Sequence, residues 1–127
     1  MNTREVVEQY FDAVNRGDWE RWLTLFDEHL VMDEQLAGHI EGTAGLRGAV
    51  EMIQKSNRTF NNYPLEIVVE GEKAMVVWNI KAVSTAGAAI DLKGANLFHV
   101  RGGKIVYLAN FHDTAPFAAP VHAAAGA

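Results

Sequence analysis

The chain has 127 residues, 49% of them hydrophobic, with no Cys and a formal net charge of −5. This length suits one domain that buries its apolar core without disulfides, and the lack of Cys excludes thiol catalysis and Cys-based metal sites and fits a reducing cytoplasm. The acidic balance, with 16 Asp plus Glu against 11 Lys plus Arg, argues against nucleic acid as a partner.

The first half of the chain predicts three helices and one short strand. Asn2 and Glu5 have the spacing of a helix capping box, and apolar residues then recur with a helical period as far as Gly17. Asp18 is placed to cap the second helix, and Thr43 to begin the third. The predicted helices cover residues 2–17, 18–26 and 43–56, with a strand at 30–32.

The second half of the chain predicts strands. Four segments rich in β-branched and aromatic residues are separated by glycine turns at positions 71, 87 and 102–103, which is typical of an antiparallel meander. The predicted strands are Leu65–Val69, Ala74–Ser84, Ala88–Val100 and Ile105–His112. Helices followed by a curved sheet predict a single α+β domain over residues 1–113, with the helices covering one sheet face.

The two ends of the chain bear on its location. Arg4, Glu5 and Glu8 exclude the apolar core of a signal peptide near the N-terminus. The segment Thr114–Ala127 is too short and too rich in Ala and Pro to cross a bilayer, and we expect it to pack loosely or to be disordered. We therefore expect a cytoplasmic protein without membrane contact.

Both faces of the predicted sheet carry apolar residues. On the last strand Val106 and Leu108 alternate with Ile105 and Tyr107, although only three helices are available to cover the sheet. We therefore expect the second face to form a homodimer interface.

The order of these elements and a set of short motifs resemble a known superfamily. The motifs are Tyr10 followed by Asn15-Arg16-Gly17-Asp18-Trp19, Leu25-Phe26, Gly42-Thr43, and Phe98-x-Val100-x-Gly102-Gly103-Lys104-Ile105. Over residues 2–113 the chain resembles the nuclear transport factor 2-like superfamily, and within it the ketosteroid isomerase and SnoaL-type polyketide cyclase group. The resemblance implies a cone of helices and curved sheet around a pocket for a small hydrophobic molecule, and chemistry without a cofactor.

The resemblance to ketosteroid isomerase implies roles for three residues. Its general base is an Asp nine residues before the Gly-Thr that opens the third helix, which is the position of Asp33. Its oxyanion-hole Tyr, seven residues before a Gly-Asp pair, corresponds to Tyr10. Its second donor is a protonated Asp, and this chain has Asn96 there, whose amide donates without a shifted pKa.

The last predicted strand supplies further candidates. The same resemblance puts Leu108, Asn110 and His112 on the pocket face, where His112 could shuttle a proton or bind a substrate oxygen. SnoaL-type cyclases use an Asp near this strand as the acid or base, which makes Asp113 an alternative base. The residues expected to contact the substrate are Phe26, Trp78, Phe98, Leu108 and Asn110.

The adjacent acidic residues and the histidines do not indicate a further site. The acidic neighbours Asp33 and Glu34 are too close in sequence to flank a glycosidic bond, so we expect Glu34 to be a solvated loop charge. The histidines show no spacing that gathers metal ligands.

The expected function is ketosteroid isomerase-like proton transfer alpha to a carbonyl, on a steroid- or polyketide-like substrate. The alternatives are a SnoaL-like aldol cyclase that uses Asp113 and His112, and a non-catalytic domain that binds a hydrophobic ligand.

Overall fold

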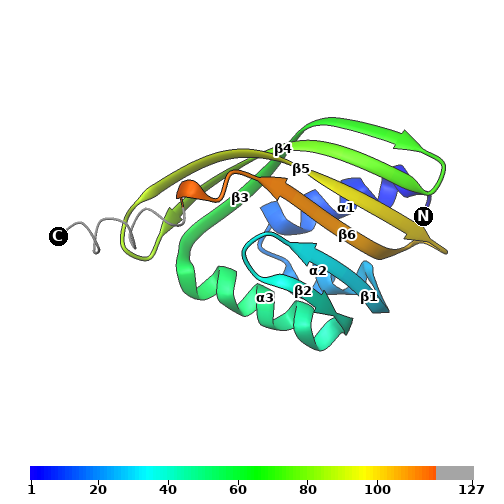
Figure 1. Ribbon diagram of the computed structural model, residues 1–127, viewed down its shortest axis with the longest axis horizontal. Helices are drawn as coiled ribbons and strands as arrows, with labels where there is room; N and C mark the ends of the chain where they lie inside the picture. Colours follow the sequence, from blue (N-terminus) through cyan, green and yellow to red (C-terminus); the bar gives the residue numbers. More distant parts are fainter. Residues whose placement is uncertain (117–127) are drawn as a thin grey trace.

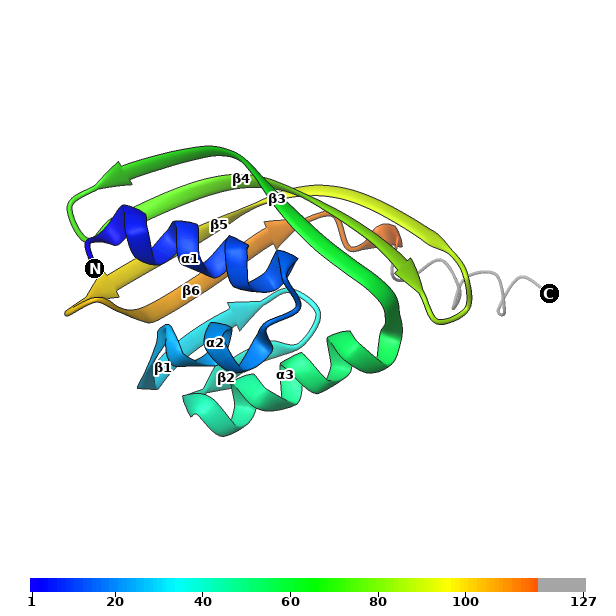
Figure 2. The same cartoon turned by 180° about the vertical axis from the view of Figure 1, so that it is seen from behind.

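The computed structural model describes residues 1–116, in which three helices lie against one face of a six-stranded sheet (Figure 1). The elements are α1 (Thr3–Asn15), α2 (Trp19–Thr24), β1 (Phe26–Glu34), β2 (Gly38–Glu41), α3 (Gly42–Ser56), β3 (Asn57–Glu70), β4 (Lys73–Ser84), β5 (Ala89–Arg101) and β6 (Lys104–His112). Figure 2 shows the molecule from the helix side, with α1 in front of the sheet and α3 beside β1 and β2. The predicted α+β architecture is confirmed, and the expectation for the end of the tail, residues 117–127, lies outside the described residues.

The predicted helix signals act as expected. Asn2 Oδ1 accepts a hydrogen bond from the Glu5 backbone N–H at 2.9 Å, and Glu5 Oε1 accepts one from the Asn2 N–H at 3.1 Å. Asp18 caps α2 by accepting from the Arg21 N–H at 3.2 Å. Gly17, between the two helices, has a φ of 67°, which favours glycine. The second helix ends at Thr24, two residues before the predicted end, because β1 begins at Phe26.

The sheet has the strand order β2-β1-β6-β5-β4-β3. Strands β3 to β6 form the predicted antiparallel meander, whereas β1 pairs with β6 in parallel. Strand β3 begins at Asn57, well before the predicted Leu65, and β2 was not predicted. Residues 57–64 are mostly polar and include Pro64, so their extended form comes from pairing with β4 at the sheet edge, where proline is tolerated.

The core lies between the helices and the inner face of the sheet. Val6 and Phe11 of α1 pack there with Val76, Phe98 and Leu108 of the sheet, all of them almost fully buried. Burying a side chain of this size contributes roughly 1.5–3 kcal/mol, so the core holds the helices on this face. None of the helices in residues 1–116 is long and apolar enough to cross a membrane.

Candidate functional site

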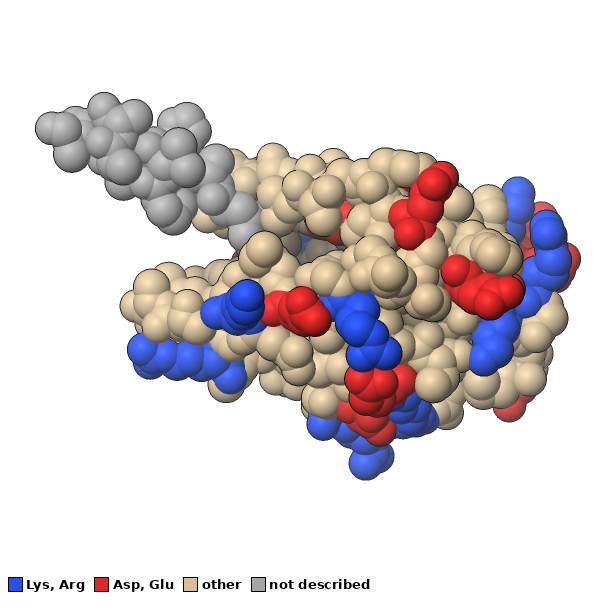
Figure 3. Space-filling model, turned by 90° about the horizontal axis from the view of Figure 1, so that it is seen from below, with Lys and Arg blue, Asp and Glu red and all other residues tan. Residues whose placement is uncertain are grey.

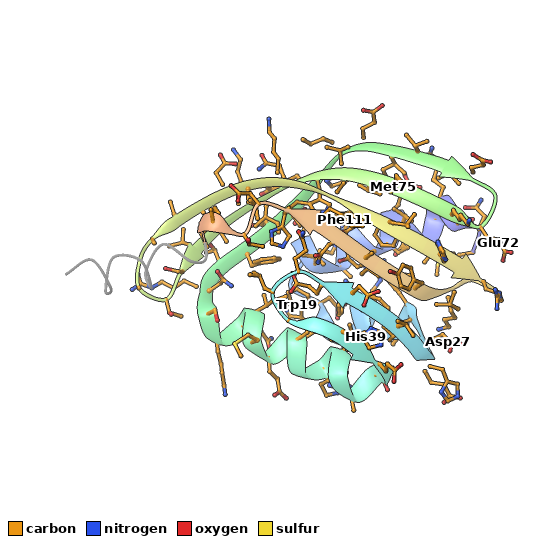
Figure 4. All side chains as sticks on the ribbon, viewed as in Figure 1. Trp19, Asp27, His39, Glu72, Met75 and Phe111 are labelled. Atoms are coloured by element: carbon orange, nitrogen blue, oxygen red, sulfur yellow. The ribbon has the colours of Figure 1, made fainter. Side chains whose placement is uncertain are left out.

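Asp33 lies on the outer face of the sheet. Its Oδ1 is 2.7 Å from His39 Nδ1, and its Oδ2 accepts a hydrogen bond from the Tyr107 hydroxyl at 2.8 Å. The Asp33 side chain is 49% exposed, and His39, labelled in Figure 4, reaches it from β2. Hydrogen bonds from His39 and then Tyr107 hold the pKa of Asp33 below its usual value. The structure therefore places the expected base away from the interior that holds Tyr10 and Asn96.

The carboxylate that faces the interior belongs to the next residue, Glu34. Its side chain is 18% exposed, because alternation along β1 puts it on the same face as the buried Leu30 and Met32. Oε2 accepts hydrogen bonds from the backbone N–H groups of Leu36, at 2.7 Å, and of Ala37. Our expectation of a solvated loop charge is wrong for Glu34, and the two-residue period of β1 was the signal that could have found it.

Glu34 meets His112, which the sequence correctly placed on the inner face of β6. Glu34 Oε1 and His112 Nε2 are 3.2 Å apart, and the His112 side chain is only 5% exposed. His112 Nδ1 lies 2.9 Å from the carbonyl oxygen of Asp113. Since a carbonyl only accepts hydrogen bonds, Nδ1 donates to it, which leaves Nε2 facing the Glu34 carboxylate. The pair can therefore give or take one proton.

Trp78 and Asn96 extend this inner surface across the sheet. Trp78 pairs with Gly94, Gly94 pairs with His112, and Asn96 pairs with Asn110 in the neighbouring row. A Cβ on Gly94 would lie 2.5 Å from the Trp78 ring, so only glycine lets this ring cross the strand. The ring centroids of Trp78 and His112 are 6.1 Å apart.

Several buried polar atoms of the interior find no partner among the described residues. They are Trp78 Nε1, Asn96 Oδ1 and Asn62 Oδ1. Trp78 is 2% exposed and Asn96 3% exposed. Leaving one such atom unsatisfied costs about 1–3 kcal/mol, so atoms of this kind are normally partnered by ordered water or by a ligand.

Tyr10 lies against the same interior, as its sequence position predicts. Its ring packs on Phe98, with centroids 5.0 Å apart, and on Trp22 at 5.5 Å. Burial raises the pKa of the Tyr10 hydroxyl, the Asn96 and Trp22 side chains lower it, and the Glu34 carboxylate raises it. Burial dominates, so the hydroxyl stays protonated and can donate. The structure thus brings together Tyr10, Asn96 and His112 with Glu34.

Comparison with known proteins places the chain in a family. The model of the SnoaL-like domain matches residues 7–108, which is most of the chain. The chain belongs to the SnoaL-like domain family. No curated protein matches its sequence.

The fold of this SnoaL-like domain recurs in solved structures. A nuclear transport factor 2-like protein of unknown function from Burkholderia pseudomallei is 17% identical, with 94% of this chain and 96% of that chain covered and a TM-score of 0.86. TerC co-crystallised with polyporic acid is 18% identical, with 91% of this chain and 94% of that chain covered and a TM-score of 0.82. A candidate polyketide cyclase from Pseudomonas putida is 21% identical, with 92% of this chain and 96% of that chain covered and a TM-score of 0.80. These likenesses establish the nuclear transport factor 2-like fold.

Other sequence candidates of the SnoaL-like domain have packing or turn roles. Phe26, Phe98 and Leu108 are buried in the core beneath the site. Asn110 Oδ1 accepts a hydrogen bond from the Gln35 backbone N–H at 3.3 Å. Asp113 is exposed, and its Oδ1 accepts from the Ala115 N–H at 2.9 Å, which ties its carboxylate to the following turn.

The surface of the SnoaL-like domain is hollowed in two places away from this site. A groove of about 310 Å³ between α2 and α3 contains Trp19 and is bordered by the Arg47–Glu20 ion pair. A more open hollow near the β3–β4 turn contains Glu72 and Met75, both labelled in Figure 4. In the face that Figure 3 shows, acidic and basic side chains are interspersed and the surface is indented beside the grey residues. Residues 1–116 contain no cluster of His, Asp and Glu suited to a metal ion.

Proposed function

We propose that this protein catalyses proton transfer next to a carbonyl of a small, largely apolar, oxygenated molecule, with Glu34 and His112 as the proton-transferring pair. One observation carries the proposal. A largely buried carboxylate–imidazole pair faces an interior in which Trp78 Nε1 and Asn96 Oδ1 have no hydrogen-bond partner. Buried polar groups of this kind are typical of a site that is completed by its ligand.

The pair suits the removal of a proton from carbon. In one state Glu34 is ionised and can take the α-proton, while His112 is an imidazolium. In the other state the carboxyl is protonated and His112 is neutral. Both states have the same net charge, which limits the cost of burying the pair. The C–H bond breaks, its electrons form the enolate double bond, and the proton resides on Glu34 until it is returned to carbon.

The enolate oxygen requires hydrogen-bond donors in fixed positions. Tyr10 supplies a hydroxyl that burial keeps protonated, and Asn96 supplies an amide. The indole N–H of Trp78 is a third available donor. Donors that are preorganised in a site shielded from water usually provide the largest part of such catalysis. Return of the proton to another carbon gives isomerisation, and attack of the enolate carbon on a second carbonyl closes a ring.

The neighbouring structures support a substrate of this general kind. One neighbour is a candidate polyketide cyclase and another was crystallised with polyporic acid. A substrate of the polyketide type has carbonyl oxygens, which can accept hydrogen bonds from Trp78 and Tyr10. It also has hydroxyl groups, which can donate to Asn96 Oδ1. We therefore place ring closure beside isomerisation as the two outcomes of one enolate step.

The test is exchange of the α-protons of β-tetralone, an enolisable bicyclic ketone, followed by NMR in deuterated buffer. We expect the wild-type protein to accelerate exchange and Glu34→Gln to lose about 100-fold of that rate, the usual size of a general acid–base contribution. Asp33→Asn is the matched control, because it changes the adjacent carboxylate on the opposite face in the same way. If Asp33→Asn instead lost the exchange rate while Glu34→Gln had little effect, the base would be Asp33, as the spacing shared with ketosteroid isomerase implies.

A second candidate function is binding of an apolar ligand without turnover. The unpartnered atoms of Trp78 and Asn96 favour it equally, because a ligand alone satisfies them. Tryptophan fluorescence with β-tetralone and similar ketones separates the two functions. Saturable quenching that is unchanged in Glu34→Gln, together with no wild-type proton exchange, would identify a binding protein.

We further propose that the outer face of the sheet binds a second copy of the chain. Val77, Ala95 and Phe111 lie in one row across β4, β5 and β6, and Met75 begins the next row. Val77 is 44% exposed, Phe111 52% and Met75 42%. A continuous apolar surface of this kind is usually covered by a partner, and a two-fold dimer lets both copies cover it at once.

A further inference from the structure

The turn between β1 and β2 is fastened to the end of β6 by two reciprocal hydrogen bonds. The Gln35 backbone N–H donates to Asn110 Oδ1 at 3.3 Å. In return, the His112 backbone N–H donates to Gln35 Oε1. We call these two hydrogen bonds the Gln35 clasp. Each bond joins a residue in the turn to a residue far along the chain, so the clasp is a tertiary contact.

The clasp lies where the backbone pairing of β1 with β6 stops. The last paired residues are Asp33 and Ala109. Glu34 and His112 therefore lie beyond the last pair, and the strand ladder does not fix the distance between them. The His112 N–H still needs an acceptor there, and a side chain supplies it.

The same turn also fixes the Glu34 carboxylate. Its Oε2 is occupied by the N–H groups of Leu36 and Ala37, which leaves Oε1 facing His112 Nε2 at 3.2 Å. The turn thus carries the carboxylate and β6 carries the imidazole. The clasp joins these two carriers directly beside the pair.

We propose that Gln35 is a positioning residue, which sets the distance between the Glu34 carboxylate and the His112 imidazole by joining the β1–β2 turn to β6. The effect on catalysis rests on the proposed function, whereas the effect on geometry does not. Gln35 is exposed, so replacing it opens no cavity in the core. Proton transfer depends steeply on geometry, and a displacement of about 1 Å can cost about 100-fold in rate.

The experiment compares Gln35→Ala, which removes the acceptor, with Gln35→Glu, which keeps an acceptor oxygen at the same length. Leu36→Ala is the matched control, since this exposed side chain belongs to the same turn but makes no bond in the clasp. Two measurements are made on each protein. The first is the ¹⁵N shift of His112 Nε2 at one fixed pH, which needs no substrate. The second is kcat and KM for proton exchange of β-tetralone, with thermal unfolding as a check on stability.

In Gln35→Ala we expect the ¹⁵N shift of His112 Nε2 to move in the same direction as it does in Glu34→Gln. We expect kcat to fall about tenfold while KM stays within about twofold, because misplaced groups weaken the transition state more than substrate binding. Gln35→Glu should restore both values, and Leu36→Ala should change neither. A wild-type Nε2 shift in Gln35→Ala overturns the proposal whatever the activity. A moved shift with unchanged kcat, while Glu34→Gln is inactive, overturns the positioning role but leaves the proposed function standing. If Glu34→Gln retains full activity, the proposed function has failed, and the Nε2 shift alone decides whether Gln35 sets the geometry.

Discussion

Two carboxylate–histidine pairs lie on opposite faces of the same end of the sheet, and their carboxylates are neighbours in the sequence. Asp33 meets His39 on the outer face, where both side chains are about half exposed. Glu34 meets His112 on the inner face, where the two side chains are 18% and 5% exposed. The nitrogen–oxygen distance is 2.7 Å in the outer pair and 3.2 Å in the inner pair, so distance alone would make the outer pair the better candidate for a reactive pair. Burial and neighbours favour the inner pair, because water screens the outer charges and competes for their hydrogen bonds.

The comparison teaches that contact distance alone does not identify a reactive pair. The Asp33 carboxylate has its pKa lowered by two hydrogen bonds, so it is a weaker base than an ordinary Asp. The Glu34 pair adjoins the hydroxyl of Tyr10 and the unpartnered amide oxygen of Asn96. Beside the inner pair, a reacting molecule would find buried polar atoms that have no partner among the described residues.

The largest expected difference between the pairs is in catalysis. His112→Gln should lower proton exchange of β-tetralone about 100-fold, because it removes one member of the proton-transferring pair. His39→Gln, the same change in the outer pair, should leave the rate within about twofold. NMR-monitored exchange in deuterated buffer measures both. Equal losses in the two variants would contradict the assignment of catalysis to the inner face.

The next largest effect concerns the inner face as a packed surface. Gly94→Ala should destabilise the fold by about 2–3 kcal/mol, because overpacking forces the Trp78 ring and the β6 backbone apart. The new Cβ would lie 2.7 Å from the carbonyl oxygen of Phe111, which cannot move as a side chain can. Gly48→Ala is the control, since a Cβ there meets nothing within 4 Å and helix propensity predicts a gain of about 0.5–1 kcal/mol. Urea unfolding of both variants checks the signs, and an unaffected Gly94→Ala would mean that Trp78 does not lie across Gly94.

A change on the outer face should alter assembly rather than chemistry. Val77→Lys puts a charge in the exposed apolar row, so the proposed dimer should dissociate to the 14.0 kDa monomer. Light scattering at micromolar concentration measures the mass. Lys81→Ala, at an exposed position farther along the same strand, should leave the dimer intact. A wild-type protein of 14.0 kDa would contradict the dimer.

The sequence predicted the fold better than the site, for physical reasons. Helix caps, glycine turns and strand alternation are local signals, and they correctly predicted all three helices and the meander. The helical period predicted Tyr10 on the apolar face of the first helix, and the family resemblance predicted His112 on the inner face of the last strand; both side chains are buried. Asp33 was chosen by counting from Gly42, and a shift of one residue in a strand moves a side chain to the other face. The period of Leu30, Met32 and Glu34 was in the sequence, but it became decisive only once β1 was known to extend to residue 34.

The remaining features depend on tertiary contacts that no local pattern encodes. Strand β2 exists because the chain turns back on β1 after Glu34, and its four residues carry little strand signal. The Gln35 clasp joins side chains to backbone groups more than seventy positions away. Such bonds are set by the rotamers of exposed polar residues, which sequence periodicity does not report.

The smallest expected effect, the pH dependence of the outer pair, has a sign fixed by the two pKa shifts. Hydrogen bonds to Asp33 and then Glu41 raise the pKa of His39 above its ordinary 6.5, so its stabilising contribution is full below that pH and is lost as pH rises through the raised value. The pKa of Asp33 is lowered from 3.8, so its contribution is present above that pH and is lost in stronger acid. The difference in Tm between the wild-type protein and His39→Gln should therefore be largest between about pH 4 and 6.5 and should shrink as the pH rises further. His29→Gln, which removes a histidine side chain that is 86% exposed, is the reference. A His39→Gln difference that grows as the pH rises above 6.5 would show that His39 stabilises the fold as a neutral ring, and the outer pair would then not be an ion pair.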